Sequence, residues 1–223
     1  MLSRKLTVIM AAITVGLFTM GLAAIATAQG TGPAMETRGV MPDKDDTVVD
    51  KLDNHFKMAR DHFMDGEYEA AADELREAAD VMREEAKESG KKAKKDLNKR
   101  ADKMDALADR VENEAVDSVN EVDKEVSKAY QSVANSKYVK STKSWANSQY
   151  DQAADELEQA GQALDESIMW SREKVESGYE KAITDARQAR KTLAKETKEA
   201  RKEVSKTMDN LGERIEDYGE ELE

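Results

Sequence analysis

The fold is decided by residues 91–134, which read KKAKKDLNKRADKMDALADRVENEAVDSVNEVDKEVSKAYQSVA. The apolar residues of this stretch follow one another at steps of three or four residues throughout. Such steps place apolar side chains on one face of an α-helix, and the pair of four-residue steps at 111–115–119 is a stutter in a heptad pattern. The stretch therefore predicts one long amphipathic helix over 91–134. Its apolar positions are Leu97, Ala101, Met104, Ala108, Val111, Ala115, Val119, Val122, Val126, Ala129 and Val133.

The flanking sequence predicts more helices of the same kind. Apolar steps of three and four residues predict helices over 46–64 and 67–88, which Asp65-Gly66 separates, so that 43–90 forms a helical hairpin. A Ser/Thr/Asn-rich segment over 135–149 predicts a short helix and turns. The remaining residues, 150–223, predict a long C-terminal amphipathic helix that can kink near Gly161, Gly178 or Gly212.

Composition agrees with an all-α fold. Both prolines, Pro33 and Pro42, precede the first predicted helix, so the rest of the chain has no residue that breaks a helix by lacking an N–H group. The chain has no cysteine, which excludes a disulfide framework and a cysteine-based metal or redox site. Its net charge of −12 disfavours binding to nucleic acid through a basic surface.

The N-terminal residues, 1–28, resemble a secretory signal peptide. Arg4 and Lys5 precede an uncharged apolar run that ends in Ala26-Thr27-Ala28, a small-x-small cleavage pattern. We expect cleavage before Gln29, a flexible leader over 29–42, and a periplasmic or secreted protein. An uncleaved membrane anchor is the alternative, because the uncharged run is long enough to span a bilayer.

Two segments of the chain resemble each other. Residues 66–78 read GEYEAAADELREA and residues 148–160 read SQYDQAADELEQA, at an offset of 82 residues. Both contain Tyr-x-x-Ala-Ala-Asp-Glu-Leu. The duplication predicts an elongated helical bundle or coiled coil that is built from two similar units, each a hairpin followed by a long helix.

The first copy resembles a single tetratricopeptide-type hairpin. The positions that carry the resemblance are Ala59, Gly66, Tyr68, Ala71, Leu75 and Ala78. No tandem array follows, so the resemblance implies hairpin geometry and not a peptide-binding solenoid. The two-copy layout is also similar to the YfdX family, a stress-associated group of periplasmic helical proteins. By composition, 91–134 and 187–208 resemble late-embryogenesis and apolipoprotein helices.

Residues that could perform catalysis are few. The two histidines, His55 and His62, lie two helical turns apart, too far to share one metal ion directly. Carboxylate pairs such as Glu84-Glu85 are common in so acidic a chain and fit a solvated helix face. Gly-rich phosphate loops and nucleophile elbows do not occur in the sequence. We therefore predict no enzymatic activity, no catalytic residues, no cofactor and no metal site.

Charge and aromatic residues indicate how the helices interact. The net charge alternates in blocks, and an antiparallel pairing would place the basic block 91–110 opposite the acidic block 207–223; random variation on a solvated surface is the alternative. Five aromatic residues cluster around the second copy. They either fill the core or form an interaction patch. They are Tyr130, Tyr138, Trp145, Tyr150 and Trp170.

These patterns predict a non-enzymatic extracytoplasmic protein that acts through protein–protein contacts, as a scaffold or a stress-associated, holdase-like protein. Its partner is another protein or a second copy of itself. Reversible lipid or envelope-surface binding in apolipoprotein fashion is one alternative, although the acidity of the chain disfavours membrane contact. A desiccation or osmotic protectant is another alternative, because the core is thin once the signal peptide is removed.

Overall fold

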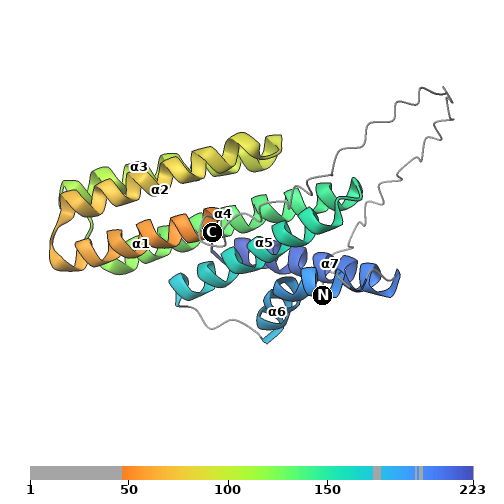
Figure 1. Ribbon diagram of the computed structural model, residues 1–223. Helices are drawn as coiled ribbons and strands as arrows, with labels where there is room; N and C mark the ends of the chain where they lie inside the picture. The colour runs from red at the N-terminus through yellow and green to blue at the C-terminus, as the bar shows by residue number, and fades with distance from the viewer. Residues whose placement is uncertain (1–46, 173–176, 194, 196–197, 223) are drawn as a thin grey trace, which may run out of the picture. The chain divides into compact units, whose positions relative to one another are not determined.

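The protein is an all-α helical bundle, which confirms the predicted fold class (Figure 1). The computed structural model describes residues 47–172, 177–193, 195 and 198–222, so the predicted signal peptide and leader lie outside the described residues. Within these ranges there are seven helices and no strand. They are α1 (Val48–Asp65), α2 (Tyr68–Glu88), α3 (Lys91–Glu112), α4 (Val119–Ala146), α5 (Tyr150–Ser171), α6 (Ser177–Leu193) and α7 (Lys198–Glu221).

Helix α4 is the centre of the packing. It contacts α1, α3, α5 and α7, while each of the other helices packs mainly against its neighbours in the sequence. Because the apolar stripes of all these helices meet, their side chains form one continuous core. The largest fully buried side chains are Leu52, Phe56, Leu75, Met82, Leu97, Met104, Tyr130, Leu157, Leu164, Leu211, Ile215 and Tyr218.

The duplicated segments form equivalent turns. Gly66 and Ser148 occupy equivalent positions in the two copies, and both have left-handed backbone, with φ of 79° and 61°. An aromatic pair closes each turn, Phe63 with Tyr68 at 5.5 Å between ring centres in the first copy. Trp145 pairs with Tyr150 at 5.0 Å in the second. The 82-residue offset that relates the sequences therefore also relates the α1–α2 and α4–α5 turns.

Residues 91–134 form two helices in place of the single helix expected from their periodicity. Helix α3 ends at Glu112, where the side-chain amide of Asn113 donates a hydrogen bond to the carbonyl oxygen of Asp109 (2.6 Å). Glu114 then takes a left-handed conformation with φ of 53°. The connection keeps Val116 buried. Ala115, which continues the apolar steps after Val111, is exposed, so the unbroken spacing here does not reflect a continuous helix.

The polar segment 135–149 continues α4 to Ala146 instead of forming a short helix and turns. Its serines face neighbouring helices, where buried hydroxyl groups need hydrogen-bond partners. Ser136 Oγ donates to Glu85 of α2 (3.2 Å), and Ser141 Oγ donates to the carbonyl oxygen of Ala153 in α5 (2.6 Å). The serine-rich composition therefore belongs to a helix that packs through polar contacts.

Residues 150–223 form three helices, α5, α6 and α7, instead of one long helix. The three glycines that were expected to allow kinks lie within these helices. At Gly161 a Cβ atom would lie 3.0 Å from the Cβ atom of Ala186, so the missing side chain allows α5 and α6 to approach closely. At Gly212 a Cβ atom would overlap the ring of Tyr138. These glycines therefore serve packing between helices.

Candidate functional site

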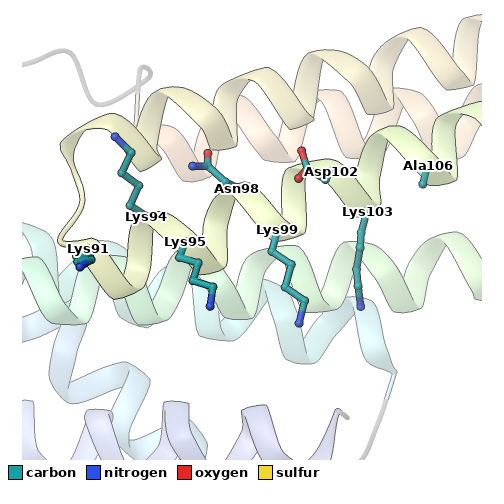
Figure 2. A pocket seen from close by; sticks show the side chains of 8 residues that line it. All are labelled: Lys91, Lys94, Lys95, Asn98, Lys99, Asp102, Lys103 and Ala106. Atoms are coloured by element: carbon teal, nitrogen blue, oxygen red, sulfur yellow. The ribbon is translucent and has the colours of Figure 1, made fainter.

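The exposed face of α3 carries a row of lysines at four-residue intervals. This spacing places the side chains on one face of the helix, about 6 Å apart along its axis. Figure 2 shows that Lys95, Lys99 and Lys103 extend from α3 in the same direction. With their neighbours they border a shallow depression of about 700 Å³. We call the four exposed residues Lys91, Lys95, Lys99 and Lys103 the α3 lysine row.

The α3 lysine row is electrostatically uncompensated. None of its four ammonium groups has an ion-pair partner among the residues that the structure describes. The arginines on nearby surfaces differ, since Arg76 pairs with Asp109 at 3.0 Å and Arg110 pairs with Glu121 at 2.5 Å. The first turn of α3 also has no acidic residue to balance the positive end of the helix dipole. The row is therefore a surface suited to bind an anionic partner.

A groove of about 410 Å³ runs between α3, α4 and α7 beside this row. Lys92 and Lys99 line it on the α3 side, and Glu216 and Glu220 line it on the α7 side. The basic and acidic blocks of the sequence thus line one groove. No ion pair joins the two sides among the described residues.

A second group of polar and charged residues, most of them buried or partly buried, lies near the meeting of α1, α4 and α5. Tyr130 is completely buried and its hydroxyl has no hydrogen-bond partner within the described protein. The same is true of one carboxylate oxygen of Asp53 and one of Glu166. The other oxygen of Asp53 accepts a hydrogen bond from Lys57 Nζ (2.6 Å).

Burial and nearby negative charge raise the pKa of two members of this group, Glu166 and Tyr130. Burial raises the pKa of Glu166, and the neighbouring charge of Asp53 raises it further. Burial also raises the pKa of Tyr130, with a further contribution from the same two carboxylates. Folding therefore makes ionisation of Glu166 less favourable than it is in the unfolded chain.

We expect Glu166→Gln to stabilise the protein near neutral pH. The folded-state pKa of Glu166 lies above its ordinary value of 4.5, so its favourable contribution is complete below that value and is lost as the pH rises through the raised pKa. The neutral amide avoids this loss. The difference in melting temperature between variant and wild type should be largest at pH 7 and should shrink towards pH 4.5. Glu158→Gln on the same helix is the control, and a difference that does not vary with pH would contradict the expectation.

Next to this group, α1, α4 and α5 line a pocket of about 400 Å³. Its wall includes Asp123, which is buried and pairs with Arg60 at 3.1 Å and with Arg172 at 2.6 Å. Both arginines thus balance the charge of one buried carboxylate. The pocket contains cations and anions in equal number, so it has no strong preference for a charged ligand.

The five aromatic residues singled out from the sequence do not form one patch. Tyr130 lies in the core, where its ring centre is 5.4 Å from that of Phe56; the half-buried Trp170 contacts the same phenyl ring at 6.4 Å. Trp145 and Tyr150 close the α4–α5 turn, and the guanidinium of Arg201 lies 4.6 Å from the centre of the Tyr150 ring. The half-buried Tyr138 lies separately, in the groove beside α7.

Each histidine lies beside a carboxylate. His55 Nδ1 is 2.7 Å from Glu74, and His62 Nδ1 is 2.6 Å from Glu67. Within the described part of the chain, no three His, Asp or Glu side chains are grouped so that they could hold a metal ion.

Sequence reasoning missed the α3 lysine row as a site, although the signal was present in the four-residue spacing within the basic block. Among the described residues, no helix is long and apolar enough to cross a membrane. Comparison with family models, with curated proteins and with solved structures finds no match to this chain. The candidate site is therefore argued from its own geometry and charge.

Proposed function

We propose that this chain is a non-enzymatic extracytoplasmic protein that acts by binding other protein chains through charged helical surfaces. The observation that carries the proposal is the α3 lysine row. Four cations on this one helix face have no ion-pair partner within the described residues, whereas Arg76, Arg83 and Arg110 each pair with carboxylates. Electrostatic complementarity of this kind favours association with an oppositely charged protein surface and sets its orientation.

The use of the apolar faces supports protein binding over apolipoprotein-like lipid binding. A helix that lies in a membrane interface must present its apolar face to the lipid. In α3 and α7 these faces are already packed in the core, so lipid binding would require the bundle to open. The buried residues include Leu97, Met104, Val111, Val204, Met208, Leu211 and Ile215. The same packing argues against a protectant that is disordered alone.

The scaffold version of the proposal is better supported than the holdase version. A holdase captures unfolded clients through exposed apolar surface, and single exposed apolar residues are ordinary on any protein. The described residues include only four large apolar side chains that are strongly exposed, and they are distributed over three helices. They are Met58, Met64, Val139 and Met169.

A photo-crosslinking amino acid at position 99 tests the proposal. In the exported full-length chain we expect protein adducts at this position, because the side chain at 99 lies in the middle of the α3 lysine row. Lys95→Ala with Lys103→Ala should reduce their yield at least tenfold. The same crosslinker at the exposed position 77 of α2 is the control. Adducts with lipid alone, or no adducts at all, would contradict the proposal.

A further inference from the structure

Helix α7 carries a row of acidic residues that mirrors the α3 lysine row. Its members are separated by four residues and all are exposed. They lie on the face opposite the buried residues Met208, Leu211 and Ile215. We call Asp209, Glu213, Asp217 and Glu221 the α7 acidic row.

Both rows are unfavourable for the helices that carry them. Like charges four residues apart on a helix repel each other. Opposite charges at this spacing attract each other instead, as in Lys57–Asp53 at 2.6 Å and Lys181–Asp185 at 2.7 Å. In the α7 acidic row the described residues provide one counter-charge, Arg214, at 3.7 Å from Asp217.

At one end of each row, the helix dipole adds to the repulsion between the like charges. The α3 lysine row begins at the N-terminus of its helix, which has positive partial charge, and the first turn of α3 has no acid. The α7 acidic row ends at the C-terminus of its helix, which has negative partial charge, and the last turn of α7 has no basic residue. Each row would therefore be stabilised by charges of the opposite sign, most of all at these two ends.

The rows match each other in number, spacing and length. Each has four charges about 6 Å apart and extends about 18 Å along its helix. An antiparallel alignment brings the N-terminus of α3 beside the C-terminus of α7, so that the two ends with unfavourable dipoles neutralise each other. This alignment pairs Lys91 with Glu221, Lys95 with Asp217, Lys99 with Glu213 and Lys103 with Asp209.

We propose that the chain associates with a second copy of itself, the α3 lysine row of one copy lying antiparallel along the α7 acidic row of the other. This inference rests on the proposed function and names the partner. The two rows lie on helix faces that point away from the core, so they face outward for a second molecule. The net charge of −12 disfavours an anionic membrane as the occupant of the lysine row.

The association is weak and depends on salt. Exposed ion pairs contribute little individually and are screened by salt, because the Debye length is about 10 Å at 0.1 M ionic strength. We expect the dimer or a larger oligomer to form at high micromolar chain concentration in about 0.1 M salt and to dissociate in about 1 M salt, where the Debye length is about 3 Å.

Charge reversal tests the pairing by sedimentation velocity. Lys95→Glu with Lys99→Glu should weaken self-association at least tenfold, and so should Glu213→Lys with Asp217→Lys. A mixture of these two variants should regain wild-type association, and so should one chain with all four changes. Lys202→Glu with Lys206→Glu, an exposed pair at the same spacing on α7, is the matched control and should leave association unchanged. Circular dichroism checks that each variant is folded.

The absence of cysteine allows a second test, of the alignment. A mixture of the Lys95→Cys and Asp217→Cys chains should form a disulfide-linked dimer under mild oxidation, whereas Lys95→Cys with Asp209→Cys should not. A wild-type chain that stays monomeric, a mixture of reversed variants that does not reassociate, or crosslinking to position 209 instead of 217 would overturn the inference. If self-association fails in this way, photo-crosslinks from position 99 to other proteins would still support the proposed function. The absence of any protein crosslink from position 99 would contradict both the proposed function and the self-association.

Discussion

Glu85→Gln is expected to lower the free energy of unfolding by about 3–5 kcal/mol, the range for removing one partner of a buried ion pair. Glu85 lies on α2 and is 5% exposed. Its two carboxylate oxygens each lie 2.9 Å from an ammonium group of α4, those of Lys137 and Lys140. Without the carboxylate, Lys137 keeps no ion-pair partner among the described residues, and Lys140 keeps only the exposed Glu88, at 3.4 Å.

The titration of Glu85 gives this prediction a pH signature. Burial alone would raise the pKa of its carboxyl group, but the charges and hydrogen bonds of Lys137 and Lys140 outweigh burial and lower it below the ordinary value of 4.5. The stability that Glu85 contributes is therefore present above pH 4.5 and is lost as the pH falls through the lowered pKa. The difference between wild type and variant should shrink in acid.

Urea denaturation followed by circular dichroism measures the effect. The matched control is Glu84→Gln, because the side chain of Glu84 is 71% exposed and, within the described residues, pairs only with Lys87 in the next turn of α2. This control should change stability by no more than about 0.5 kcal/mol. Replacing Glu85, Lys137 and Lys140 together by leucine should recover most of the loss, because no unpaired charge remains. A Glu85→Gln variant as stable as the control would show that this cluster does not hold α2 on α4.

Phe56→Ala is expected to destabilise the protein by about 3–5 kcal/mol as well, through loss of packing. Its side chain is fully buried. The phenyl ring contacts Tyr130 of α4 edge-on at 5.4 Å and Trp170 of α5 at 6.4 Å. Alanine would leave a cavity at the point where α1 meets both of these helices, and the surrounding side chains can collapse into it only in part.

The fluorescence of Trp170 provides a local readout, since loss of the adjacent phenyl ring should expose the indole and shift its emission to longer wavelength. Trp145→Phe removes the other tryptophan from the signal. Phe63→Ala is the control, because Phe63 is half-buried at the α1–α2 turn and its loss should cost only about 1 kcal/mol. Equal losses for the two phenylalanine variants would contradict the role of Phe56 in packing α1 against α4 and α5.

Local signals in the sequence were sufficient to predict the first hairpin and the duplication. Asp65-Gly66 interrupts the apolar pattern at a position where the backbone is left-handed, which glycine adopts without strain. The second copy has Ser148 at this position and still makes the same turn. The repeated Tyr-x-x-Ala-Ala-Asp-Glu-Leu segment was therefore a better guide to the turn than glycine itself.

Periodicity failed where two helices share one core. The apolar steps continue across Glu114 through Ala115, which is exposed, whereas the buried residue after the turn is Val116, five residues beyond Val111. A pattern of apolar residues shows which side chains could face the core of a continuous helix and does not record whether the backbone between them turns. The candidate site could be predicted from the sequence only in part. The four-residue spacing shows that the lysines share one helix face, but whether they have ion-pair partners depends on which helices pack nearby.

The sequence by itself determined the all-α class, the first hairpin and the existence of two related copies, because helix propensity, apolar spacing and a left-handed turn residue act within a few residues of chain. The tertiary structure decided where the long amphipathic stretches break, and which polar residues are buried. Glu85 and the exposed Glu84 are adjacent and chemically identical. Because α4 packs against α2 at Glu85, this carboxylate is buried between Lys137 and Lys140, whereas Glu84 stays in solvent.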